Sequence, residues 1–133
     1  MSLEACALVL IGGFLGGIAR FLLSGFVGRR VGETFPWGTF AVNLSGAFLI
    51  GLAAGLGRYA DGFFAEAMFR DFVIVGVLGG YTTVSSFSLQ SLNLALGGEH
   101  GRAAFNVVAS SVLCVAGVAA GFLMVQWTSG RLP

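Results

Sequence analysis

GVLGGYTTVSSFS, residues 76–88, is the stretch of sequence that decides the fold. It lies inside an apolar run from about Phe63 to Leu96, which can cross a bilayer because about 20 residues suffice. Glycine tolerates backbone angles that other residues avoid, and hydroxyl side chains compete for backbone hydrogen-bond partners. The centre of the run carries both kinds of residue: Gly79, Gly80, Thr82, Thr83, Ser85 and Ser86. We therefore predict a transmembrane helix that is broken at mid-membrane.

A break at this depth has a consequence for function. It frees backbone N–H and C=O groups, which a membrane tolerates only where they face protein, water or an ion. Discontinuous helices of this kind hold substrates and ions in transporters, so the break is a candidate site. The alternative is a continuous helix whose small residues form a packing face, which is common in membrane proteins. Composition alone does not separate the two interpretations.

The overall composition places the whole chain in the membrane. Of its 133 residues, 56% are hydrophobic and 10% are charged, whereas a soluble domain averages about 25% charged residues. Short polar loops separate four apolar segments, which cover residues 5–27, 37–56, 66–96 and 103–127. The sequence thus predicts one all-α membrane domain over residues 1–133. Its four helices should run up and down, with both termini on one side.

The loops give no preferred orientation in the membrane. Three arginines fall on each side, so the usual excess of positive charge on the cytoplasmic side is missing. The terminal side has Arg58, Arg70 and Arg131, and the other side has Arg29, Arg30 and Arg102. A chain without a preference can insert both ways and pair antiparallel with itself; the alternative is that another factor decides the orientation. Glycines four residues apart, such as Gly12 and Gly16, also predict close helix packing and oligomerisation.

Polar side chains inside the predicted spans mark a candidate pathway, because each must find a partner in the bilayer. Asn43 lies in the second span, and Asn106 and Ser110 are four residues apart in the fourth. Arg20 lies near the end of the first span, where it could reach the headgroups or provide a fixed positive charge. Hydrogen bonding between helices is the simpler explanation for Asn43 alone. Together with Ser110 and the broken span, Asn43 favours a lined pathway.

The kind of polar residue indicates the kind of solute. Amide and hydroxyl groups donate hydrogen bonds without net charge, and the ring edge of Phe87 is weakly positive, so these groups suit an anion. A proton-coupled small-molecule exporter, the alternative for a protein of this size, would need a carboxylate deep in the membrane. Glu4 and Glu66 lie near span ends, and no pattern indicates an enzyme or a nucleic-acid-binding protein. Cys6 and Cys114 are expected to be packing residues.

Residues 76–88 resemble the third-helix signature of the Fluc/CrcB fluoride channels, usually written like GFxGGxTTFSTFS. GGFLGGIARF at residues 12–21 and PWGTFAVNLSGAFLIG at residues 36–51 resemble the first- and second-helix motifs of that family, in the same order. The resemblance implies a four-span protein that forms an antiparallel, dual-topology homodimer in the plasma membrane of a microbe. Such a dimer would carry fluoride passively out of the cell through two pores, and hold a structural Na⁺ at its centre.

The same resemblance implies roles for individual residues. Gly79 and Thr82 would supply backbone carbonyls to the Na⁺, together with the same residues of the second subunit. Five further residues would serve the anion: the Asn43 amide, the Phe87 ring edge, the Thr83 and Ser110 hydroxyls, and Arg20 at an aqueous vestibule.

The sequence departs from the family pattern at three positions. Val84 stands where the family normally has a second phenylalanine, three residues before Phe87, and valine has no polarised ring edge. Asn106 replaces a common tyrosine, and Gln90 replaces a common acidic residue. Conduction with one phenylalanine per subunit, weakened transport and an altered site all remain open. The chain could also be one half of a heterodimer whose mate supplies the missing ring.

Overall fold

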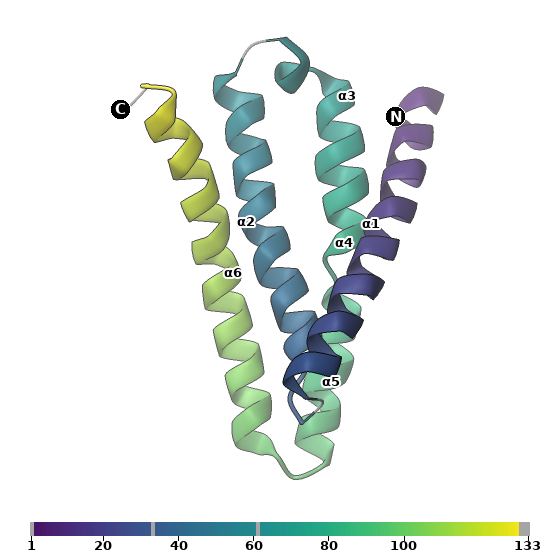
Figure 1. Cartoon of the computed structure of the whole chain (residues 1–133), viewed down its shortest axis with the longest axis vertical. Coiled ribbons are helices and arrows are strands. Elements are labelled where there is room, and N and C mark those ends of the chain that lie inside the picture. The colour runs from purple at the N-terminus through teal and green to yellow at the C-terminus, as the bar shows by residue number, and fades with distance from the viewer. Residues whose placement is uncertain (1, 33, 61, 131–133) are drawn as a thin grey trace.

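The structure is a computed structural model of the chain and describes residues 2–32, 34–60 and 62–130. All regular elements in these residues are helical (Figure 1). Four helical stretches are long and apolar enough to cross a membrane: Leu3–Val31, Trp37–Tyr59, Ala67–Leu96 and His100–Thr128. The prediction of an all-α protein with four membrane helices is therefore confirmed, and the helices match the expected spans to within a few residues.

The chain runs up and down, so that both termini lie at one end of the bundle (Figure 1). Helix α1 (Leu3–Val31) begins at Ser2, whose hydroxyl accepts the Ala5 N–H at 3.2 Å, and ends at Gly32 with a φ of 105°. Helix α2 (Trp37–Tyr59) follows Pro36, and α6 (His100–Thr128) is the last element. Arg131, expected on the terminal side, lies outside the described residues.

The third span is not one regular helix. After the 3₁₀ turn η1 (Gly62–Ala65), the span consists of a short helix, a π-helical segment, one further turn and a final helix: α3 (Ala67–Phe69), η2 (Arg70–Leu78), α4 (Gly79–Tyr81) and α5 (Val84–Leu96). Thr82 and Thr83 between α4 and α5 are extended, with φ, ψ of −76°, 157° and −149°, 119°. The predicted break is present, and the alternative of a continuous packing helix is wrong.

Glycines let α1 approach the third span closely, and α6 approach α2. A Cβ added to Gly12 would lie 2.6 Å from the Phe72 carbonyl oxygen of η2, and one added to Gly121 would meet the Phe48 carbonyl oxygen of α2. A Cβ on Gly17 meets nothing within 4 Å. Glycines such as Gly12 and Gly121 thus allow close packing between helices of the same chain. Helix α1 crosses the third span obliquely (Figure 1).

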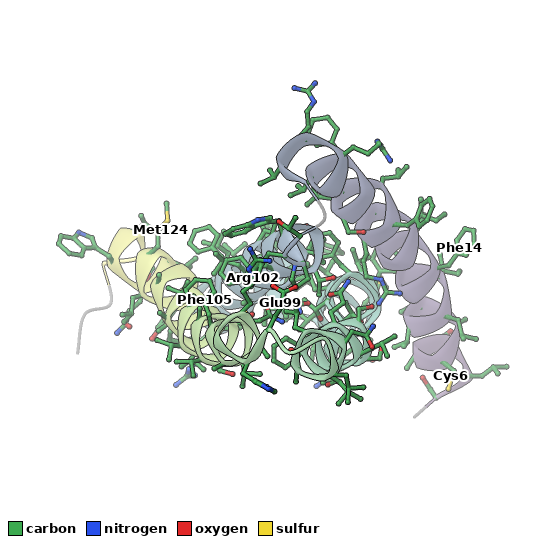
Figure 2. All side chains as sticks on the ribbon, turned by 90° about the horizontal axis from the view of Figure 1, so that it is seen from below. Cys6, Phe14, Glu99, Arg102, Phe105 and Met124 are labelled. Carbon is green, nitrogen blue, oxygen red and sulfur yellow. The ribbon has the colours of Figure 1, made fainter. Side chains whose placement is uncertain are left out.

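The outer surface of the bundle is apolar. Figure 2 shows Phe14 on α1 and Met124 on α6 directed away from the other helices, and these side chains are 68% and 57% exposed. Large exposed apolar side chains follow α1, the third span and α6, whereas α2 exposes only Leu49 among them. Such a surface is suited to the hydrocarbon core of a bilayer.

Candidate functional site at the helix break

One side chain of α2 satisfies the backbone at the break. The Thr83 N–H donates to Asn43 Oδ1 at 2.8 Å, and Asn43 Nδ2 donates to the Thr83 carbonyl oxygen at 2.9 Å. Unpaired backbone groups at mid-membrane are costly, so this pair of bonds stabilises the interruption. An amide nitrogen carries two hydrogens, and the bond to Thr83 uses one of them.

A second contact from α2 holds the other side of the break. The Ser45 hydroxyl lies 2.8 Å from the Tyr81 hydroxyl and 2.7 Å from the Ala41 carbonyl oxygen. Because serine has one hydroxyl hydrogen, Tyr81 donates to Ser45 when Ser45 donates to Ala41. The sequence did not single out Ser45 or Tyr81, although they lie close to Asn43 and Thr83 along the chain.

The hydroxyl cluster of the third span begins α5. Thr83 is its N-cap, because Thr83 Oγ1 accepts the Ser86 N–H at 3.2 Å. The Thr83 hydroxyl also lies 3.1 Å from Ser85 Oγ and 3.2 Å from Ser86 Oγ. Hydrogen bonds of these threonine and serine side chains therefore take the place of backbone hydrogen bonds that the break removes.

The break diverts the donors of two backbone carbonyls. In an uninterrupted helix, the Thr83 N–H would donate to the Gly79 carbonyl oxygen, and the Ser86 N–H to that of Thr82. Here the first donates to Asn43 Oδ1 and the second to Thr83 Oγ1. Gly79 is moreover exposed on the surface of the chain. The two carbonyls predicted as Na⁺ ligands are thus both released from their usual helical partners.

The residues that the structure describes contain no group of three or more His, Cys, Asp or Glu that could hold a metal ion. A cation at the break would therefore have to be held by oxygens without such a cluster. Carbonyl oxygens of unwound membrane helices are known ligands of Na⁺, so the donor set at Gly79 and Thr82 fits this ion.

A cavity of about 250 Å³ lies beside the break, between α2, α5 and α6. It brings together four of the residues predicted to serve the anion, Asn43, Thr83, Phe87 and Ser110, and Val84 lines it as well. No charged side chain lines it. Val84 of α5 is 77% exposed, and Ser111 of α6, which also lines the cavity, is exposed too. One chain therefore leaves the cavity open at its surface.

Arg20 lies in a different cavity, of about 230 Å³, with Thr39, Thr83 and Ser86 among its lining residues. Thr83 lines both cavities. The structure therefore divides the predicted anion residues into two groups, a cationic one beside α1 and an uncharged one beside α6, with Thr83 at the boundary between them.

A buried polar chain links α6 to α5 next to Phe87. Asn106, which is 2% exposed, donates from Nδ2 to Ser91 Oγ at 2.9 Å, and Ser91 donates to the Phe87 carbonyl oxygen at 2.7 Å. Ser110 donates to Asn106 Oδ1 at 3.4 Å. The sequence pattern identified Asn106 and Ser110 as polar residues of the fourth span but not Ser91. Its spacing of four residues from Phe87, which places both on one helix face, could have indicated it.

Comparison with known proteins identifies relatives over nearly the full length of the chain. Residues 7–122 match the family described as CrcB-like protein, camphor resistance. A Brucella abortus protein named fluoride-specific ion channel FluC 4 is 64% identical over 127 residues, which cover 96% of each chain. FluC 3 of Brucella suis is 63% identical, with the same coverage. FluC 2 of Bradyrhizobium diazoefficiens is 49% identical over 122 residues, covering 92% of this chain and 89% of that protein.

Proposed function

The chain belongs to the family of CrcB-like proteins, and we propose that it is a passive, fluoride-selective channel of a prokaryotic plasma membrane. It is a multi-pass membrane protein and not an enzyme. Within the molecule, the uncharged cavity beside the helix break carries the proposal, because Asn43, Phe87 and Ser110 meet there without any carboxylate. Its task is to export fluoride and so relieve fluoride toxicity.

The geometry of this cavity suits a small anion that gives up its water. The Asn43 N–H that Thr83 does not use is a free neutral donor, and the Phe87 ring edge adds a weak positive potential. The Ser110 and Thr83 hydroxyls donate to Asn106 and Ser86 in this structure, so they serve the anion by turning away from these partners. Arg20, in the neighbouring cavity, raises the local concentration of anions. No coupling to protons is required, since the membrane potential drives an anion outward with about 2.3 kcal/mol per 100 mV.

The alternatives have less support. A proton-coupled exporter would require a titrating carboxylate in the pathway, and the lining of the cavity contains none. An obligate heterodimer would explain Val84, because a partner chain could supply the missing ring. Nothing else in the chain favours that alternative, and a stable, active assembly of this protein expressed alone would exclude it.

The active form that we propose is an antiparallel homodimer. Two observations support a second copy: the cavity beside the break is open on the side of Val84, and Gly79 is exposed. The balanced arginines allow the two copies to insert in opposite orientations. Carbonyls of Gly79 and Thr82 from both subunits would then hold a Na⁺, which would neutralise the converging carbonyl dipoles and join the subunits.

Fluoride efflux from liposomes tests the proposed function. Purified protein should release fluoride from loaded vesicles at a rate far above that of protein-free vesicles, with little release of chloride. A passive channel should also keep this rate when a proton gradient is imposed or collapsed. Efflux no faster than from empty vesicles would contradict the channel, and a rate that follows the proton gradient would favour an exporter.

A further inference from the structure

A third polar cavity lies at the end of the bundle away from the termini. Its volume is about 290 Å³, and its lining includes Thr34, Gln90, Asn93 and Glu99. These residues come from the α1–α2 loop, from α5 and from the α5–α6 loop. This end of the bundle therefore has an opening between its two loops.

This cavity and the uncharged cavity lie next to each other along α5. Phe87 lines the uncharged cavity, and Gln90 lines this one. Residues three apart on a helix lie one turn apart on the same face, so the two cavities follow each other along α5. The buried Gln90 Oε1 has no hydrogen-bond partner among the described residues, so a donor from outside these residues is needed to satisfy it.

An ion pair lies at this opening. Arg102 Nη1 donates to Glu99 Oε2 at 2.5 Å and to the Thr34 carbonyl oxygen at 3.3 Å. Looking onto this end of the bundle, Figure 2 shows Glu99 and Arg102 next to each other, between the ends of α5 and α6. The side chains are 44% and 53% exposed, so they remain in contact with water.

We propose that Arg102 sets the rate at which anions pass this opening, by neutralising the Glu99 carboxylate. An unpaired carboxylate at the mouth of an anion pathway repels every anion that enters or leaves there, and the guanidinium cancels this repulsion. The inference rests on the proposed channel function. Arg29, Arg30 and His100 are the other ionisable groups of this end in the described residues, and all variants below keep them unchanged.

The expected size of the effect follows from electrostatics in water. An uncompensated unit charge about 7 Å from the passing anion changes the local anion concentration roughly threefold at low ionic strength. The Debye length falls from about 30 Å at 0.01 M salt to about 3 Å at 1 M, so high salt should remove the effect. A change in structure would not respond to salt in this way.

The test compares fluoride efflux from liposomes at low internal fluoride, where entry into the pathway limits the rate. Arg102→Gln should slow efflux about threefold in 0.01 M impermeant salt and restore it in 1 M salt. Glu99→Gln/Arg102→Gln and Arg102→Lys should both keep the wild-type rate, because neither leaves an unpaired carboxylate. Arg70→Gln is the matched control, since it leaves Asp71 without its partner at the other end of the bundle, and it should have no effect.

Two results would overturn the proposal. One is an Arg102→Gln rate equal to the wild-type rate in low salt. The other is a slow rate that persists in high salt and in the double variant, which would mean that Arg102 acts only through its bond to Thr34. If the wild-type protein itself releases no fluoride, the channel function fails, and that outcome is recognised before any variant is compared.

Discussion

At the residue scale, Asn43 connects the sequence pattern to the site. The sequence predicted that this residue would face a pathway, and the structure places it in the cavity beside the break. The sequence could not predict that the Asn43 amide also hydrogen-bonds both the N–H and the carbonyl group of Thr83. The two residues are 40 positions apart in the chain, and such a contact depends on how α2 packs against the third span, which no local pattern encodes.

Val84 gives a prediction at this scale. It lines the uncharged cavity one turn before Phe87 and is 77% exposed. Val84→Phe would add a second polarised ring edge to the wall of the cavity. Fluoride efflux from liposomes should therefore rise severalfold over the wild-type rate.

Val108→Phe is the control, because Val108 is similarly exposed on α6 but does not line this cavity. An equal rise in both variants would mean that added aromatic surface acts through the membrane. An unchanged or reduced rate in Val84→Phe alone would contradict a favourable ring contact at this position.

At the element scale, the third span shows what composition can and cannot predict. Glycines and hydroxyls in mid-span predicted the break, because such residues offer the backbone alternatives to a helix. The π-helical segment from Arg70 to Leu78 was not predicted. A π-helix shifts each backbone hydrogen bond by one residue, to i→i+5, and an apolar run without clear periodicity does not reveal such a shift. Both irregularities lie in the span that carries the site.

Two neighbouring glycines of α1 test how closely that helix packs on the third span. A Cβ on Gly16 would meet the Val77 carbonyl oxygen and would lie 2.8 Å from the Tyr81 nitrogen, whereas a Cβ on Gly17 meets nothing within 4 Å. Gly16→Ala should therefore force α1 away from the third span and destabilise the protein by about 1–3 kcal/mol.

Gly17→Ala should be neutral or stabilising by up to about 1 kcal/mol, because alanine favours the helix. Unfolding of both variants in the same detergent gives the comparison. Equal stability of the two variants would mean that α1 does not approach the third span as closely as described.

At the scale of the whole molecule, two features of the single chain support the proposed second copy. The uncharged cavity is open beside Val84, and the Gly79 carbonyl belongs to an exposed residue. The sequence predicted two copies from balanced arginines and from the family resemblance. The arrangement of the two copies depends on how their surfaces fit together. Neither the sequence pattern nor the structure of one chain determines that fit.

Removal of sodium tests the proposed assembly. If Na⁺ joins two subunits through the carbonyls of Gly79 and Thr82, replacing it by a large organic cation should lower the thermal stability of the dimer and slow fluoride efflux. Light scattering would measure the oligomeric state in both buffers. Restoring Na⁺ should reverse the change, while equal amounts of K⁺ should restore less. Identical stability and efflux in all three cations would contradict a specific sodium site.

The diverted carbonyls at the break have a consequence for how this protein tolerates mutation. Their oxygens belong to the main chain, so replacing the side chains at positions 79 and 82 does not delete them. The sensitive position is instead Asn43 on another helix, because its amide keeps the Thr83 N–H from returning to the Gly79 oxygen. Random mutagenesis should therefore find that substitutions at positions 79 and 82 are tolerated, whereas substitutions of Asn43 are not. The mutations that disturb the break would then lie mostly outside the third span, on the helix that packs against it.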